Sequence, residues 1–349
     1  MRPRRRLARV LVALTMAVVA ALATAQAPPA VTADAVADRM QKLVDAARRE
    51  GELTIYTSTP VDDMKVMTDA FERKYGVKTK VWRASSEKVL QRAIAEARAG
   101  RFDADIYDTN GPELEALVRE RMLLPISSPA LSDLLPEAVF PHRAWVGARL
   151  VIFAFAYNTN LVKKSELPSS YEGFADPRWK GKLAIEADDA DWFATVSGLL
   201  GERDAERLFR AIVANNGVSL RKGHTLLANL VAAGEVPLAL TVYNYKAEQL
   251  KSKGAPIDWF VLPPAIARVN GLAVSARAPH PNAAMLWFEF VLGVEGQRLL
   301  LTREFVPTNR RVETTLNRFP LRFVDSAAVL DESAKWEQRY ADIFGGPPR

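Results

Sequence analysis

Short apolar runs alternate with amphipathic stretches along most of the chain, a pattern typical of a sheet of strands covered by helices. The apolar residues of Leu226–Val231 recur at helical spacing and stop at Gly234, a residue suited to ending a helix. Val236–Val242 follows and is too apolar and too short for a surface helix. We therefore predict an α/β fold with doubly wound sheets, in which Val236–Val242 is a buried strand.

Polar and aromatic side chains follow this strand directly, as Tyr243, Asn244 and Tyr245. Open α/β folds bind small molecules in the crevice outside the carboxyl ends of their strands. We predict that these three residues line a ligand site. A tyrosine pair that only packs against the strand end remains an alternative.

The first part of the chain is predicted to contribute three more strand ends of this kind. The strands Glu52–Thr57, Val77–Trp82 and Ala104–Tyr107 are each followed by a short polar loop and a helix. The candidate ligand residues of these loops are Ser58, Thr59, Ser85, Ser86 and Asn110. Three polar loops on one sheet edge indicate half of a ligand cleft, although hydroxyls at such positions also cap helices.

A second group of candidates follows the apolar run Arg149–Tyr157, which we interpret as a strand that crosses between two lobes. The loop after the predicted strand Leu183–Glu186 contains Asp189, Asp191 and Trp192, and His224 begins a later helix. Carboxylates at a helix N-terminus are favoured by the helix dipole even without a ligand. A ligand contact and a structural role therefore both remain open for the acidic loop.

The N-terminus has the pattern of a secretory signal peptide. Five arginines in the first nine residues precede an apolar run from Val10 to Ala23, and small residues follow. The run is shorter than the roughly 20 residues of a membrane-spanning helix. We expect a signal peptide over residues 1–25, cleavage after Ala25 or Ala27, and a periplasmic mature protein without a transmembrane helix.

Composition excludes several classes of function. Five of the 47 Lys and Arg residues lie in the predicted signal peptide, which has no Asp or Glu, so 42 basic residues remain against 41 acidic residues. The net charge of +1 and the absence of a basic aromatic patch argue against nucleic-acid binding. Zero Cys excludes disulfides and thiolate chemistry. Asp191 and His224 could form an acid/base pair, but no catalytic motif accompanies them, so an enzyme is the weaker alternative.

The order of the segments resembles the periplasmic solute-binding proteins of ABC importers, specifically the two-lobed type II group that includes the ferric-iron binders. The resemblance spans nearly all of Glu52–Val312 and is carried by GELTIYTS, DADIYDTNGPELEAL, WVGARLVIFAFAYNTNLV, DPRWKGKLAI, LVAAGEVPLALTVYNY and FVPTNRRV. It implies two α/β lobes, joined by crossing strands, that close on one ligand. It also implies no catalysis and no cofactor, and an inner-membrane ABC permease as the partner. We expect a monomer; a sensor domain would have the same fold.

The resemblance implies a discontinuous first lobe of residues 33–148 and 268–349 and a second lobe of residues 149–267. The last segment shows one apolar helical face, and we expect this face to pack on the first lobe. Its residues are Val329, Trp336, Tyr340, Ile343 and Phe344.

Ferric binders of this group hold the metal with an adjacent tyrosine pair at the strand end matched here by Leu238–Val242. Tyr245 matches the second tyrosine and Asn244 falls on the first, while Tyr243 is displaced by one residue, a shift that turns a side chain to the opposite face of a strand. Tyr243 and Tyr245 are thus the candidate metal ligands. If they converge with Asp189, Asp191 and His224, they would supply an oxygen-rich set that suits Fe³⁺ as the transported ligand. The same rings and hydroxyls would suit a small organic solute, and both alternatives remain open.

Overall fold

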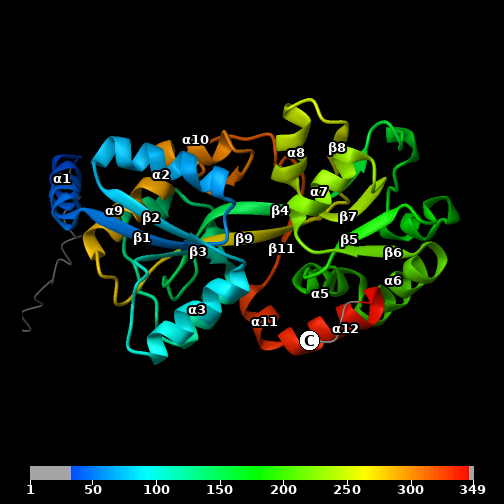
Figure 1. Ribbon diagram of the computed structural model, residues 1–349, viewed down its shortest axis with the longest axis horizontal. Coiled ribbons are helices and arrows are strands. Elements are labelled where there is room, and N and C mark those ends of the chain that lie inside the picture. The colour runs from blue at the N-terminus through cyan, green and yellow to red at the C-terminus, as the bar shows by residue number, and fades with distance from the viewer. Residues whose placement is uncertain (1–32, 346–349) are drawn as a thin grey trace, which may run out of the picture. The chain divides into compact units, whose positions relative to one another are not determined.

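The computed structural model describes residues 33–345, so the predicted signal peptide lies outside the described residues (Figure 1). Its strands are β1 (Glu52–Thr57), β2 (Lys78–Arg83), β3 (Ile106–Asn110), β4 (Val146–Asn158), β5 (Leu183–Glu186), β6 (Val218–Arg221), β7 (Leu238–Tyr243), β8 (Ile257–Phe260), β9 (Ala265–Val274), β10 (Val306–Pro307) and β11 (Leu321–Phe323). Its α-helices are α1 (Ala33–Glu50), α2 (Val61–Tyr75), α3 (Ser86–Arg98), α4 (Gly111–Arg119), α5 (Ala190–Leu200), α6 (Glu202–Asn216), α7 (His224–Ala233), α8 (Asn244–Ser252), α9 (Pro281–Leu292), α10 (Val294–Leu301), α11 (Ser326–Asp331) and α12 (Ser333–Phe344). Within residues 33–345, no helix is long and apolar enough to span a membrane.

The strands follow the order β2-β1-β3-β9-β4-β7-β5-β6. Strand β1 pairs in parallel with β2 and β3, and β5 pairs in parallel with β6 and β7. Between these two parallel groups, β9 and β4 run antiparallel to each other and to their outer neighbours. Both strands are buried along their whole length. Strand β4 is the crossing strand that the apolar run at Arg149–Tyr157 predicted, and β9 is a second strand beside it.

We define the first lobe as β1–β3 with the helices that cover them. Helices α2, α9 and α10 pack against one another, and α3 packs with α4 on the other side of the strands (Figure 1). Helix α2 ends at Gly76, whose φ of 74° is the left-handed conformation that glycine favours. Strands β1, β2 and β3 are each followed within a few residues by the N-terminus of a helix (α2, α3 and α4), so the polar loops lie at helix N-termini, as the sequence predicted.

We define the second lobe as β5–β7 with α5–α8 and α12. Helices α7 and α8 pack together, while α5, α6 and α12 form the other layer (Figure 1). The hydroxyl of Tyr340 in α12 donates to the Glu186 carbonyl at 2.6 Å, and the Phe344 ring lies 5.9 Å from that of Phe209.

The prediction that the last segment packs on the first lobe was wrong for α12. Only Glu332 separates α11 from α12, and α11 packs on α4 of the first lobe whereas α12 packs on the second. The apolar face exists as predicted, and Trp336 and Ile343 are buried in it. Helical periodicity identifies such a face but not the surface that covers it.

Candidate ligand-binding site

Arg268 on β9 is the centre of a buried polar cluster. Its Nε donates to Asp191 Oδ2 at 2.7 Å and its Nη2 to Asp191 Oδ1 at 2.6 Å, which is a bidentate ion pair. Its Nη1 donates to the hydroxyl oxygen of Tyr243. The guanidinium also lies over the Phe153 ring, 4.8 Å from the centroid. Strand β9 thus holds a cation against two predicted ligand residues of the second lobe.

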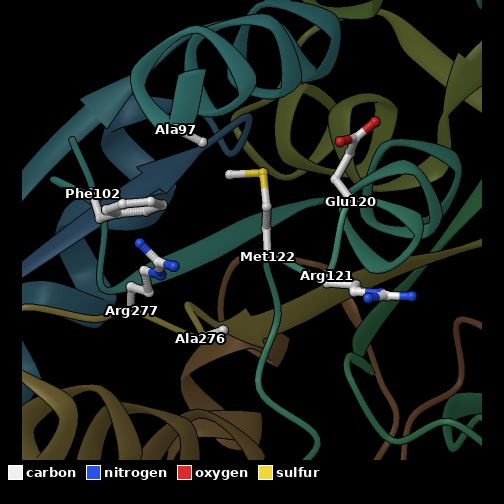
Figure 2. A pocket seen from close by; sticks show the side chains of 7 residues that line it. All are labelled: Ala97, Phe102, Glu120, Arg121, Met122, Ala276 and Arg277. Carbon is white, nitrogen blue, oxygen red and sulfur yellow. The ribbon is translucent and has the colours of Figure 1, made fainter. Parts of the chain in front are cut away.

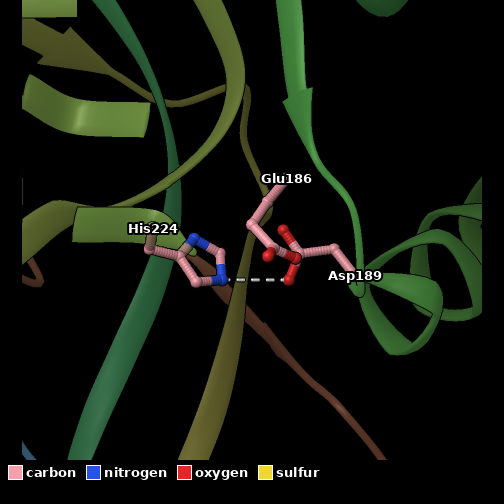
Figure 3. Close-up of side chains that lie close together, drawn as sticks. All are labelled: Glu186, Asp189 and His224. Atoms are coloured by element: carbon pink, nitrogen blue, oxygen red, sulfur yellow. Dashed lines mark hydrogen bonds and ion pairs between the residues drawn. The ribbon is translucent and has the colours of Figure 1, made fainter. Parts of the chain in front are cut away.

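A second cluster consists of Glu186, Asp189 and His224 (Figure 3), and His224 connects it to the first. The His224 ring stacks on Tyr243 with centroids 3.4 Å apart, and its Nε2 lies 3.1 Å from Asp189 Oδ1. Glu186, at the end of β5, completes the group, and one ligand atom from each of the three residues lies within 4.8 Å of the others. Burial, followed by the charge of Asp189, raises the pKa of Glu186 to about 7. Glu186 and Asp189 are close together in the chain, whereas His224 lies 35 positions after Asp189 and is brought to them by the fold.

The two tyrosines lie on the same side of the chain. Their rings are stacked with centroids 5.9 Å apart, because Tyr243 ends β7 and Tyr245 belongs to the first turn of α8, so strand alternation does not separate them. Burial raises the pKa of both phenols. Tyr245 packs on Phe305 at 4.2 Å between centroids. Although the rings are stacked, Tyr243 also contacts Arg268 and His224 of the polar clusters, whereas Tyr245 contacts Phe305.

Two residues of the predicted site belong to the core instead. Trp192 is 1% exposed and lies 5.5 Å from Phe209 between ring centroids. Asn244 is fully buried, and its Oδ1 accepts a hydrogen bond from the Ile152 amide at 3.0 Å. Trp192 therefore packs the second lobe and Asn244 anchors β4, so neither presents a surface to a ligand.

Some first-lobe candidates are engaged by Arg149 on β4. Its guanidinium donates to Asp108 Oδ1 at 3.1 Å and to Thr59 Oγ1 at 2.6 Å. Ser58 Oγ accepts from the Thr109 hydroxyl at 3.3 Å. Thr59 is thus part of a buried network that ties the first lobe to a crossing strand.

The remaining first-lobe candidates have structural partners. Ser85 caps α3 by accepting from the Lys88 amide, which is the alternative stated for such hydroxyls, and Ser86 is buried in the first turn. Asn110 Oδ1 accepts from Asn270 Nδ2 at 2.9 Å. These contacts connect β3 to β9 and α3 to its loop. Most of the predicted ligand residues that form polar clusters are therefore in the second lobe.

Sequence reasoning missed four charged residues of the site: Arg149, Arg268, Glu113 and Glu186. The available signal was a single arginine in each of the apolar strands β4 and β9, since a buried charge requires a partner. Glu113 lies in the first turn of α4, and its Oε2 is buried without a hydrogen-bond partner in the described part of the chain. Burial raises its pKa to about 7, which the nearby Arg268 opposes.

A pocket of about 260 Å³ lies elsewhere, at the amino end of β3 (Figure 2). The Arg277 guanidinium lies over the Phe102 ring there, 4.6 Å from the centroid. Its other lining residues are Ala97, Glu120, Arg121, Met122 and Ala276. Because the polar strand ends lie at the opposite edge of the sheet, this pocket is separate from the candidate site.

The chain matches the family model described as bacterial extracellular solute-binding protein over residues 66–317, which is more than half of its length. It is 25% identical over 268 residues to the Fe(3+)-binding periplasmic protein of Serratia marcescens, covering 74% of this chain and 78% of that one. The structure of iron-bound HitA from Pseudomonas aeruginosa superposes with a TM-score of 0.73 at 23% identity, covering 84% of this chain and 99% of that one. AfuA from Actinobacillus pleuropneumoniae with bound fructose-6-phosphate superposes with a TM-score of 0.74 at 22% identity and the same coverage.

These similarities confirm the predicted fold of two α/β lobes. They also confirm the predicted class, because the family consists of solute-binding transport proteins that work with ABC importers rather than of enzymes. The chain therefore belongs to the bacterial extracellular solute-binding protein family.

Proposed function

We propose that the protein is a periplasmic carrier that captures a ferric ion, or a ferric complex, between its two lobes and delivers it to an ABC importer in the inner membrane. The observation that carries this proposal is the group formed by Asp189, Asp191, His224 and Tyr243 at the carboxyl ends of β5, β6 and β7. The relatives support it, since the Serratia protein is named for Fe(3+) binding and the HitA structure is iron-bound. In this proposal the mature chain begins after Ala25 or Ala27 and acts as a monomer.

The charge of the site favours a cation. Glu186, Asp189 and Asp191 are all buried, and Arg268 is the buried guanidinium that faces the two aspartates. Carboxylates removed from water need a cation or hydrogen-bond donors beside them. Fe³⁺ prefers anionic oxygen ligands, so it would balance the carboxylates that the single guanidinium does not.

Hinge closure fits the arrangement of the two crossing strands. Arg149 on β4 pairs with Asp108 of the first lobe, and Arg268 on β9 pairs with Asp191 of the second. A ligand bound between the lobes would therefore lie next to both ion pairs. The proposed lobes keep the sequence boundaries at 149 and 267, with α12 reassigned to the second lobe.

A small organic anion is the second candidate, and the two guanidiniums favour it. Arginine binds carboxylate and phosphate groups in bidentate geometry. The AfuA structure, which contains fructose-6-phosphate, has the same fold. Such a ligand would have to displace Asp108 from Arg149 or Asp191 from Arg268, because both guanidiniums are already paired.

Loading experiments on the mature protein separate the candidates. The protein is stripped with a chelator, incubated with ferric citrate, and freed of excess metal before elemental analysis and thermal unfolding. We expect one iron per chain and a raised melting temperature, because a ligand that binds only the folded state stabilises it. No iron after loading, together with a higher melting temperature in fructose-6-phosphate, would favour the organic anion.

A further inference from the structure

Three side chains of the second lobe converge on one small volume. Glu186 ends β5, Asp189 lies in the loop that follows, and His224 is the first residue of α7. Figure 3 shows the two carboxyl groups and the imidazole pointing toward one another. Their nearest ligand atoms all lie within 4.8 Å of each other, close enough for a single metal ion to reach one atom from each residue.

This group has unused polar atoms. Asp189 is 1% exposed, and within the described residues its Oδ2 has no hydrogen-bond partner. The Nδ1 of His224 is also buried without a partner there. Buried polar atoms in folded proteins are nearly always paired, because an unpaired one costs about 1–3 kcal/mol. A group with an unpaired carboxylate oxygen and an unpaired imidazole nitrogen is suited to accept a cation.

The backbone holds Glu186 in place. Its two carboxylate oxygens accept from the Gly223 amide at 2.7 Å and from the Asp188 amide at 2.5 Å. Its own amide donates to Thr241 Oγ1 at 3.1 Å. Outer contacts of this kind orient metal ligands and fix their geometry. The residue is therefore held in position before any ion arrives.

The tyrosines have fewer free atoms. The Tyr243 oxygen already accepts a hydrogen bond from Arg268, and the guanidinium occupies the place beside it that a cation would take. Tyr245 is 6% exposed and packs on Phe305. The carboxylate and imidazole group is thus the part of the candidate site with the most free ligand atoms.

We propose that Glu186, Asp189 and His224 bind the transported metal ion directly. This inference rests on the proposed function, because it names ligands for the same cargo. Two carboxylates and one imidazole form a set that accepts iron. Three protein ligands also leave coordination positions open, so the ion can keep oxygen atoms of the small anion that delivers it. His224, whose side chain is 12% exposed, is the member of the set that solvent still reaches.

The test uses isosteric variants and a matched control. Glu186→Gln, Asp189→Asn and His224→Gln each remove one ligand atom, while Asp204→Asn makes the same kind of change at an exposed carboxylate of α6 that is paired with Arg207. Iron per chain is measured after ferric citrate loading, and affinity by competition with citrate. We expect each of the three variants to lose tenfold or more in affinity and Asp204→Asn to bind as the wild type does. Circular dichroism and urea unfolding show whether each variant is folded.

Two results overturn the inference in different ways. If the wild type binds iron and the three variants keep its affinity while Tyr243→Phe loses it, the ligands are wrong but the proposed function stands. If the wild type binds no iron, both fail. Pulsed electron paramagnetic resonance is measured on the iron-loaded wild type, so its result does not depend on whether a variant folds. A bound imidazole nitrogen couples to the ferric spin and is detected by this coupling. Absence of this coupling would also overturn the role of His224.

Discussion

The ammonium group of Lys246 lies 3.2 Å from Asp63 Oδ2, and this contact joins the first turn of α8 in the second lobe to the first turn of α2 in the first lobe. Asp63 is 1% exposed and also binds Arg303 Nη2 at 2.6 Å and Gln249 Nε2 at 3.0 Å. Lys246 follows Tyr245 in the chain. The lobes are therefore joined by an ion pair between a buried aspartate and a partly buried lysine.

Replacing Lys246 with Met should weaken ligand binding. The variant removes the interlobe charge but leaves Arg303 paired with Asp63. Hydrogen bonds to charged groups contribute about 1.5–3 kcal/mol, so a closed state that needs this contact should bind iron about tenfold more weakly or worse. Titration with ferric citrate measures the change. Lys65→Met, at an exposed lysine of α2, is the matched control, and equal affinities in the two variants would show that closure does not use the interlobe pair.

Replacing Arg268 with Met should destabilise the protein strongly. The change leaves Asp191 buried and unpaired, and breaking a buried ion pair in this way costs about 3–5 kcal/mol. The double variant with Asp191→Asn should recover part of this loss, because the unpaired charge is gone. Urea unfolding measures both. Arg277→Met, at an exposed arginine that lies over Phe102, should cost about 1 kcal/mol or less. If the double variant is no more stable than the single variant, the two residues are not coupled.

Trp192 should matter for stability and not for ligand contact. Truncation of a buried Trp to Ala typically costs about 3–5 kcal/mol, and Trp192→Ala should lower the free energy of unfolding by that amount. Trp192→Phe keeps most of the ring and should bind iron with wild-type affinity. Calorimetric titration at a temperature where both proteins are folded provides the comparison. A large loss of affinity in the Phe variant would show that Trp192 contributes to ligand binding after all.

The pH dependence of the free energy of unfolding should reflect the titration of Glu186. Its pKa is raised to about 7 in the folded state, so its protonated form is favoured there and its contribution to stability is fully present below the unfolded pKa. That contribution is lost as pH rises from about 4.5 toward 7, with a slope of at most about 1.4 kcal/mol per pH unit. Urea unfolding of the metal-free protein across this range should show a shallower slope in Glu186→Gln than in the wild type.

Metal binding should show the opposite trend. A carboxylate must lose its proton to bind iron, so affinity should rise as pH increases through 7. Citrate competition at several pH values measures this. An affinity that does not change between pH 6 and about 8 would mean that Glu186 is not a ligand.

The sequence was sufficient to predict the architecture. Apolar runs such as Arg149–Tyr157 and Val236–Val242 are visible without a structure, and they are β4 and β7. The second-lobe cluster was predicted in part, because Asp189 and His224 each follow a strand and the carboxyl ends of parallel strands meet at one edge. Glu186 was read only as a strand end, since nothing in its neighbours shows which way its side chain points.

The rest depends on contacts between distant segments. Trp192 is adjacent to Asp191, yet the helix places one side chain in the core and the other on Arg268, a divergence that spacing of one residue in a helix always produces. Arg268 could have been suspected as a lone charge in an apolar strand, but its partner lies 77 positions away in the chain. Burial and pairing are properties of the folded chain, so local pattern cannot supply them.

The single residue between α11 and α12 has a practical consequence for measuring motion. Since α12 packs on α5 and α6, a fluorophore attached to its exposed face would travel with the second lobe although its place in the sequence is far from β5–β7. A second fluorophore on α3 would travel with the first lobe, and energy transfer between the two would report opening and closing in real time. The rings of Trp336 and Phe344 in α12 pack on Phe193 and Phe209, so removing the last thirteen described residues would uncover these two side chains. Helix α12 therefore cannot be removed to make a smaller sensor.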